Sequence, residues 1–235
     1  MPLPSSSKAL RLALFDLDHT LLPIDSDVSW ANELARLGLV DPEWQRRRND
    51  EFYEDYKAGV LDIEAFLAFQ LGPLGEHPRH RLEAWRAEFL ARVIFPAIHD
   101  PARALVQRHK DEGFRCAVVT ATNDFITRPI AQAFGIDQLI ATEVETDAKG
   151  EFTGRHKGLP NFREGKVTRV AQWLALEGLG LEDFNESWFY SDSMNDLPLL
   201  ARVSHPVATN PDERLQAHAQ AQGWPILELF KSSEA

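Results

Sequence analysis

The sequence predicts an α/β fold, in which a Rossmann-like parallel sheet carries helices on both faces and a helical bundle is inserted as a cap. Two observations support this fold class. Short apolar runs alternate with longer amphipathic stretches in the first and last parts of the chain, and such alternation favours a parallel sheet covered on both faces. Between these parts, consecutive helical patterns occur without any strand pattern.

The predicted strands are short and apolar, as expected of strands buried on both faces. They lie at residues 12–15, 116–120, 138–142, 187–191 and 205–209. The amphipathic stretches between them predict helices at about 100–112, 124–134, 164–178 and 195–202. Turn residues between two alternating arms predict a β-hairpin over 143–156.

Residues 26 to about 95 predict the inserted bundle. Apolar residues recur there at three- and four-residue spacing, and Gly or Pro separates the stretches SWANELARLG, PEWQRRRNDEFYEDYKAG, DIEAFLAFQL and RHRLEAWRAEFLARVI. We expect Trp30, Trp44 and Trp85 to pack in the bundle core. The sequence thus predicts a core domain of residues 1–22 and 96–235 and a cap domain of residues 23–95.

The composition indicates a cytoplasmic protein that binds neither nucleic acid nor membranes. The chain has 235 residues and a formal net charge of −11, whereas nucleic-acid binders usually carry a basic stripe. The basic cluster Arg46–Arg48 is followed closely by acidic residues. No apolar run approaches the length of a membrane span, and the short polar N-terminus is not typical of a secretory signal. The single cysteine, Cys116, excludes an internal disulfide.

The stretch LALFDLDHT places two carboxylates directly after an apolar strand. In an extended chain Asp16, Asp18 and Thr20 point the same way, toward the carboxyl edge of the sheet, where open α/β sheets bind ligands. Crowded carboxylates repel each other unless one is protonated or a cation lies between them. Mg²⁺ is the simplest such cation, although solvated acids or helix caps would produce the same pattern.

Three later stretches place polar residues at the same predicted edge. The strand VVT ends in Thr120, the stretch EGKVTRV starts a helix with Lys166, and FYSDSMND follows a strand with Asp192. Histidines 77, 80, 99 and 109 lack metal-ligand spacing, and we expect them at the surface.

These motifs, in this order, resemble those of the haloacid dehalogenase superfamily of phosphohydrolases. The resemblance covers about residues 12–229, and the helical insert is similar to the C1-type cap of subfamily IB, the phosphoserine phosphatase-like branch. It implies a phosphatase that hydrolyses a small phosphorylated metabolite with Mg²⁺ through an aspartyl-phosphate.

The resemblance also implies a role for each motif residue. Asp16 would be the nucleophile and Asp18 the general acid and base. Mg²⁺ would be held by Asp16, the backbone carbonyl of Asp18, and Asp192. Phosphate binding and support would come from Thr20, Thr120, the Ala121 amide, Lys166, Asn195 and Asp196.

The substrate is less well defined. Asp25 stands where phosphoserine phosphatases often have a glutamate that binds the substrate amine, and Ala121–Asn123 replaces their usual Gly-rich stretch. Asp25 and Asp27 could therefore bind a cationic group, or they could cap the following helix. Arg46 could reach a substrate carboxylate, or it could lie on a solvated face. These features suggest an amino-alcohol phosphate such as phosphoserine or histidinol phosphate.

Two other functions fit the same residues. A phosphotransferase or mutase would use the same aspartyl-phosphate. A catalytically silent binding protein could also keep the fold, but we would expect such a protein to have lost a motif residue, and all of the motif residues are present here. The sequence leaves open whether the protein is a monomer or a homodimer, and whether Mg²⁺ or Mn²⁺ is preferred.

Overall fold

The computed structural model describes residues 9–230, and its centre is a sheet of seven strands in the order β4-β3-β2-β1-β5-β6-β7. The strand bounds are β1 Arg11–Phe15, β2 Arg115–Asn123, β3 Gln138–Thr146, β4 Phe152–Lys157, β5 Glu186–Ser191, β6 His205–Thr209 and β7 Ile226–Leu227. All neighbouring pairs are parallel except β3 and β4, which form an antiparallel hairpin. The parallel strands therefore end at a common edge.

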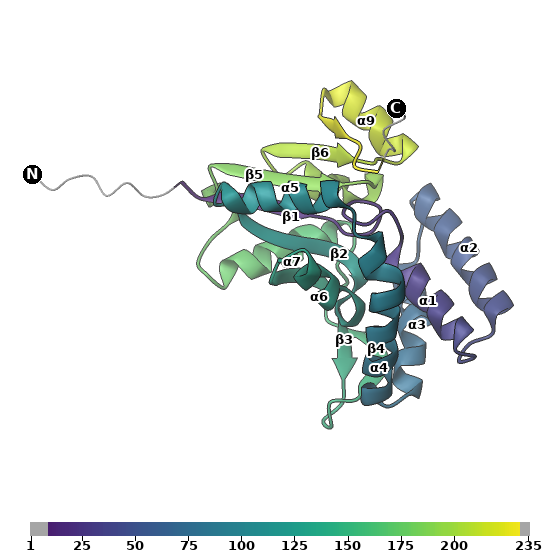
Figure 1. Ribbon diagram of the computed structural model, residues 1–235. Helices are drawn as coiled ribbons and strands as arrows, with labels where there is room; N and C mark the ends of the chain where they lie inside the picture. The colour runs from purple at the N-terminus through teal and green to yellow at the C-terminus, as the bar shows by residue number, and fades with distance from the viewer. Residues whose placement is uncertain (1–8, 231–235) are drawn as a thin grey trace, which may run out of the picture.

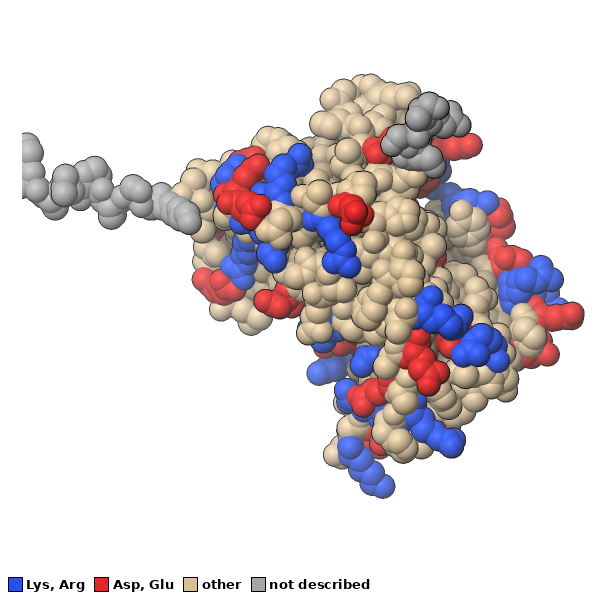
Figure 2. Space-filling model, in the orientation of Figure 1, with Lys and Arg blue, Asp and Glu red and all other residues tan. Residues whose placement is uncertain are grey.

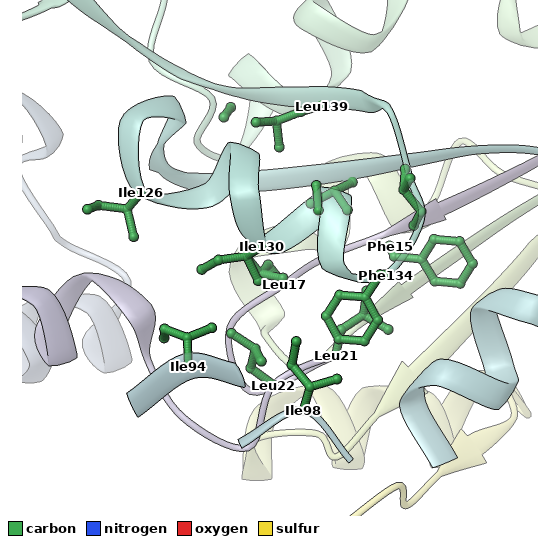
Figure 3. Close-up of a cluster of buried hydrophobic side chains, with 14 of the residues drawn as sticks. Phe15, Leu17, Leu21, Leu22, Ile94, Ile98, Ile126, Ile130, Phe134 and Leu139 are labelled. Atoms are coloured by element: carbon green, nitrogen blue, oxygen red, sulfur yellow. The ribbon is translucent and has the colours of Figure 1, made fainter. Parts of the chain in front are cut away.

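Strand β1 is central, between β2 and β5, and its side chains divide the hydrophobic core into two layers. Ala13 and Phe15 belong to one buried cluster, and Leu12 and Leu14 belong to the other, as the two-residue repeat of a strand requires. Figure 3 shows part of the first cluster, where Phe15 lies among side chains that include Phe134.

Helices cover both layers. Residues of α5 (Asp100–Asp111) and α6 (Asp124–Ala133) contribute to the first cluster, whereas α7 (Glu164–Ala175), α8 (Leu197–Leu200) and α9 (Glu213–Gln222) contribute to the second. The short turns η4 (Leu181–Asp183) and η5 (Met194–Asp196) flank β5.

Every element in the segment between β1 and α5 is a helix, and turns and loops connect these helices. The segment contains α1 (Ser26–Arg36), α2 (Pro42–Ala58), α3 (Ile63–Leu71), η1 (Gly72–Glu76), α4 (Arg79–Phe89), η2 (Leu90–Ile94) and η3 (Phe95–Ala97). Asp25, Asp41 and Asp62 cap α1, α2 and α3 with their side chains, as N-cap preferences predict. Figure 1 shows α1 to α4 grouped on the side to which the β6 arrow points.

The hairpin β3–β4 supports the inserted helices, because β4 packs against α3 and η1. The approach is close: a Cβ atom on Gly75 would lie 2.9 Å from the carbonyl oxygen of Thr153. A larger residue at position 75 would therefore push the inserted helices away from the hairpin.

Most of the predicted elements are confirmed, with differences at the C-terminal end. All five predicted strands form, and the first arm of the predicted hairpin continues β3. Helix α9 and strand β7 were not predicted, and α8 is shorter than the predicted helix over 195–202. Trp30 is buried as expected, but the expectation for Trp44 is wrong because its side chain is exposed.

The prediction that His109 lies at the surface is also wrong. His109 is buried, and its Nε2 lies 2.7 Å from the hydroxyl oxygen of Tyr190. Burial lowers the pKa of His109 to about 4, so the imidazole is neutral at ordinary pH and acts as a packing residue beneath the sheet.

Figure 2 shows acidic and basic side chains interspersed on the face that it presents. Within residues 9–230, every helix is too short or too polar to cross a membrane.

Candidate active site

Asp16 lies directly after β1, at the carboxyl edge of the sheet, and is almost completely buried. Its backbone amide donates to the carbonyl oxygen of Tyr190 on β5, at 2.9 Å. Its Oδ1 accepts a hydrogen bond from Lys166 Nζ at 2.8 Å, and its Oδ2 accepts one from the Thr20 hydroxyl at 3.3 Å. Burial raises the pKa of Asp16, and the nearby Lys166 opposes that rise.

The chain does not stay extended after Asp16, so the prediction that the side chains of residues 16, 18 and 20 all point the same way is wrong. The amides of Leu21 and Leu22 both donate to the carbonyl oxygen of Leu17, which folds the segment into a turn. His19 has a φ of 56°, in the left-handed region. This turn returns Thr20 to Asp16 and directs Asp18 to different partners.

Asp18 is held by two donors from outside its own turn. Its Oδ1 accepts from the amide of Ser26 at 2.7 Å, and its Oδ2 accepts from the hydroxyl of Thr122 at 2.8 Å. Burial and the neighbouring charge of Asp25 raise the pKa of Asp18 to about 6. A carboxyl with this pKa can both donate and accept a proton near neutral pH.

Thr122 was not predicted as a site residue. The available signal was its position two residues after Thr120 on the same strand, which places both side chains on one face. The amide of Thr122 also donates to the Thr120 hydroxyl oxygen at 3.2 Å. Thr120, Ala121 and Thr122 all line the cavity described below.

Lys166 lies in the first turn of α7 and connects two carboxylates. Its Nζ donates to Asp16 at 2.8 Å and to Asp196 at 2.7 Å. Burial alone would lower the pKa of Lys166, but the two carboxylates outweigh it and raise this pKa above its ordinary value. The preceding Gly165 permits this helix start, because a Cβ atom there would lie 2.1 Å from the carbonyl oxygen of Pro160.

Asp192 follows β5 and shares a donor with Asp16. The Thr20 hydroxyl lies 3.1 Å from Asp192 Oδ1 and 3.3 Å from Asp16 Oδ2, yet it has only one proton to donate. Burial raises the pKa of Asp192 well above its ordinary value, and the charges of Asp16 and Asp196 add to this effect. A cation placed between Asp16 and Asp192 would relieve this crowding.

The donor set suits Mg²⁺. Within residues 9–230, no three acidic, histidine or cysteine side chains converge as a complete cage. Mg²⁺ typically takes one or two protein carboxylates and keeps several water ligands, so Asp16 and Asp192 fit its requirements.

Asp196 and Asn195 have separate partners. Asp196 Oδ2 accepts hydrogen bonds from Lys166 and from the Ser191 hydroxyl, and burial raises its pKa to about 6 although Lys166 lowers it. Asn195 Oδ1 accepts from Arg163, and its Nδ2 donates to the carbonyl oxygen of Tyr56 on α2. Asn195 therefore contacts the inserted helices and is not part of the cavity wall.

A cavity of about 340 Å³ lies at this edge of the sheet, between the core and the inserted helices. Its floor includes Asp16, Thr120, Lys166 and Asp192. Most of its aromatic residues come from the inserted helices, namely Phe52, Tyr53 and Tyr56 of α2 and Phe66 of α3, and the core adds Phe162.

Two further hydrogen bonds, besides the one from Asn195 to the Tyr56 carbonyl oxygen, hold the C-terminal part of α2 against the core. The Tyr56 hydroxyl lies 2.7 Å from Ser193 Oγ, and Arg214 donates to the carbonyl oxygen of Lys57 at 2.7 Å. The inserted helices therefore cover the cavity in this structure.

The two predicted substrate contacts differ in their placement. Asp25 lines the cavity, but its Oδ1 caps α1 by accepting from the amides of Asp27 and Val28, both at 2.9 Å. Arg46 is not among the cavity-lining residues. Its exposed side chain lies 3.7 Å from Asp50 one helical turn away, so the structure does not bring Arg46 to the site.

Comparisons with known proteins agree with this geometry. The family model described as haloacid dehalogenase-like hydrolase matches residues 13–201. A histidinol-phosphatase from Neisseria meningitidis is 46% identical over 217 residues, which cover 92% of this chain and 98% of that protein. A phosphoserine phosphatase from Mycobacterium tuberculosis is 32% identical and covers 91% of this chain and 69% of that protein.

Solved structures are also similar. A protein of unknown function from Bordetella pertussis Tohama I has a TM-score of 0.89 and 53% identity, and the match covers 95% of this chain and all of that one. A phospho-aspartyl intermediate analogue of phosphoserine phosphatase has a TM-score of 0.68 at 20% identity, with 96% of both chains covered, which supports the fold alone. The chain belongs to the haloacid dehalogenase-like hydrolase family, as a phosphatase of that family.

Proposed function

We propose that the protein is a Mg²⁺-dependent phosphomonoesterase that hydrolyses histidinol phosphate through a phosphorylated Asp16. The observation that carries the chemistry is the buried Asp16 carboxylate, which Lys166 Nζ holds at 2.8 Å opposite Thr120 in the same cavity. Residues 23–95 would act as the cap domain that closes this cavity and selects the substrate.

In the first half of the reaction, Asp16 attacks the phosphorus atom, and the bond between phosphorus and the ester oxygen breaks. Lys166 restrains the nucleophile and adds positive charge near the phosphoryl oxygens. Asp18, which Thr122 and Ser26 hold in place, gives its proton to the leaving alcohol.

In the second half, Asp18 accepts a proton from a water molecule, which attacks the phosphorus atom. The bond from phosphorus to Asp16 breaks, and inorganic phosphate leaves. Mg²⁺ bound by Asp16, Asp192 and the Asp18 carbonyl would offset the repulsion between the carboxylate and the phosphate. Asp196 keeps Lys166 in position through the 2.7 Å hydrogen bond.

Two features of the cavity support the choice of histidinol phosphate over phosphoserine in this proposal. Phosphoserine has a carboxylate that needs a cationic partner, but no arginine is among the residues of 9–230 that line the cavity. The lysines that line the cavity are already paired, Lys57 with Glu54 and Lys166 with Asp16. The aromatic side chains of the cap suit a flat imidazole ring, and the 46% identical relative is named a histidinol-phosphatase.

A substrate panel tests this proposal. Hydrolysis of L-histidinol phosphate, O-phosphoserine and a hexose phosphate is measured with Mg²⁺ and with EDTA. We expect histidinol phosphate to have the highest kcat/KM, the hexose phosphate the lowest, and EDTA to remove activity that added Mg²⁺ restores. A hexose phosphate as the best substrate, or full activity in EDTA, would contradict the proposal.

A further inference from the structure

Three carboxylates that line the cavity close to the start of α1 lack a cationic partner. Asp18, Asp25 and Asp27, which we call the cation-free group, all line the cavity. Within residues 9–230, none of the three forms an ion pair. Burying a carboxylate without a partner is costly, so the hydrogen bonds of each member show which one is left to bind a ligand.

Asp27 is the least satisfied member of this group. Both oxygens of Asp18 accept hydrogen bonds. Asp25 accepts two backbone amides on Oδ1 as the cap of α1, and although its Oδ2 has no donor among residues 9–230, Asp25 is only partly buried, so water can reach it. Asp27 is only 5% exposed, yet within the described residues it accepts a single hydrogen bond, from Asn123 Nδ2 to its Oδ1 at 3.1 Å. Its second oxygen has no donor, although the residue lines the cavity.

The single hydrogen bond to Asp27 has a defined direction. Asn123 Oδ1 caps α6 by accepting from the amide of Ile126 at 3.1 Å, so its Nδ2 is the end that faces Asp27. The amide group of Asn123 therefore holds a carboxylate oxygen of Asp27 while leaving the other oxygen open.

One short stretch of chain relates Asp27 to the reaction centre. Thr120 lines the phosphate end of the cavity, Thr122 binds Asp18, and Asn123 binds Asp27. The end of β2 therefore connects the proposed phosphate-binding residue, the proposed acid and base, and the residue that holds Asp27.

We propose that Asp27, held by Asn123, binds the ammonium group of the substrate, and that Asp25 acts only as a helix cap. This inference rests on the proposed function, and it assigns amine recognition to a different residue from the one that the family resemblance suggests. An ammonium group would supply both the missing donor and the missing positive charge.

The test compares two substrates that differ only in the amine, L-histidinol phosphate and imidazolylpropyl phosphate. Asp27→Asn and Asp25→Asn form a matched pair, because each replaces one carboxyl group with an amide of the same size and Asn can still cap a helix. We expect Asp27→Asn to lower kcat/KM for histidinol phosphate by about 10- to 100-fold, the range for a hydrogen bond to a charged group. It should leave the amine-free ester within about threefold, and Asp25→Asn should leave the ratio of the two substrates unchanged.

Each other outcome has a distinct meaning. If the wild type does not prefer the amine, the proposed substrate class fails. If the wild type prefers it and Asp27→Asn keeps that preference, the role of Asp27 is wrong, and selective loss in Asp25→Asn would transfer the role to Asp25.

A second variant keeps the test valid if Asp27→Asn folds poorly. Asn123→Ser retains a side-chain oxygen to cap α6 but removes the amide that holds Asp27. We expect a selective loss for the amine substrate of about fivefold, as for one hydrogen bond, together with weaker binding of the product histidinol in calorimetry. Equal losses for both substrates with unchanged histidinol binding would overturn the proposal.

Discussion

Two sets of carboxylates meet at the cavity, and they differ in how their charge is balanced. Asp16, Asp192 and Asp196 surround Lys166, which bonds two of them. The cation-free group of Asp18, Asp25 and Asp27 lines the same cavity, and its members form no ion pair among residues 9–230. One set is already organised around a fixed positive charge, whereas the other has none until a ligand brings it.

This difference separates the charge-balanced site of the nucleophile from Asp27, the proposed recognition residue, while Asp18 in the second set keeps its proposed role as general acid and base. A reaction centre benefits from charges that are in place before the substrate arrives, because no reorganisation is then needed. A specificity site can instead leave a carboxylate unpaired, so that the matching ligand is favoured and others leave it unsatisfied. The following variants test the two sets in order of decreasing expected effect.

The largest effect should come from the nucleophile. We expect Asp16→Asn to lower kcat by roughly 10⁴-fold or more, as for other catalytic nucleophiles, while the chain stays folded. Steady-state kinetics with Mg²⁺ and thermal unfolding of the same preparation measure the two effects. A kcat within tenfold of the wild type would exclude Asp16 as the nucleophile.

Removing the central cation should affect both stability and activity. Lys166→Met leaves Asp16 and Asp196 buried without their partner, so we expect the free energy of unfolding to fall by about 3–5 kcal/mol. Urea unfolding measures this loss. The exposed control Arg46→Met should change it by about 0.5 kcal/mol or less, and adding Asp196→Asn to Lys166→Met should recover part of it. Equal effects of Lys166→Met and Arg46→Met would contradict the buried pairing.

Asp27, a member of the cation-free group, should make the free energy of unfolding depend on pH in a defined direction. Burial, with the charges of Asp25 and Asp18, raises the pKa of Asp27 well above its ordinary value. The folded chain then holds this proton more tightly than the unfolded chain, so its stabilising contribution is lost as pH rises through the folded-state pKa.

We therefore expect Asp27→Asn to gain stability relative to the wild type as pH increases above about 4, the ordinary pKa of aspartate. Chemical unfolding at a series of pH values measures this difference. Asp25→Asn, which removes one of the charges that raise the pKa of Asp27, should reduce this pH dependence only in part. A parallel pH dependence of Asp27→Asn and wild type would mean that Asp27 is charged without a partner.

The contact between cap and core should have a smaller effect. Tyr56→Phe removes the hydrogen bond to Ser193, which should cost about 1 kcal/mol of stability. We expect kcat/KM for histidinol phosphate to fall by about fivefold, since a cap that opens more easily covers the substrate less well. Ser193→Ala should lose somewhat more, because Ser193 Oγ also accepts from the amide of Asn195 at 3.2 Å, and the double variant should lose no more than Ser193→Ala alone. Additive losses would show that the two residues act separately.

The smallest expected loss of stability tests whether Asp25 acts as a helix cap or as a substrate ligand. Asp25→Ala should lose about 1 kcal/mol of stability, whereas Asp25→Asn should lose only a few tenths, because Asn caps as well as Asp. Differential scanning calorimetry of both variants compares them. Equal losses in the two variants would argue against the capping role.

Local sequence patterns were sufficient to predict most of the fold and the residues around Asp16. Apolar runs identify buried strands, and parallel strands bring Asp16, Thr120 and Asp192 to one edge whatever the length of chain between them. The short strand β7 and the helix α9 escaped because their patterns are weak. His109 was misassigned because its partner Tyr190 lies 81 residues away in the chain.

The details of the site depend on contacts that no local pattern contains. The turn at His19, rather than strand alternation, separates Asp18 from Asp16. The bonds from Thr122 to Asp18 and from Asn123 to Asp27 join segments about a hundred residues apart. Asp25 and Asp27 look equivalent in sequence, and only their different hydrogen bonds distinguish a cap from an unsatisfied carboxylate.

The most direct test of the proposed chemistry is to trap the phosphorylated enzyme. Wild type, Asp16→Asn and Asp18→Asn are mixed with Mg²⁺ and an aryl phosphate, whose leaving group needs no acid, then quenched in acid and analysed by peptide mass spectrometry. We expect phosphate on Asp16 in the wild type, more of it in Asp18→Asn, which lacks the base for hydrolysis, and none in Asp16→Asn. Turnover of the aryl phosphate without any phosphate on Asp16, or with phosphate on another residue, would contradict the account.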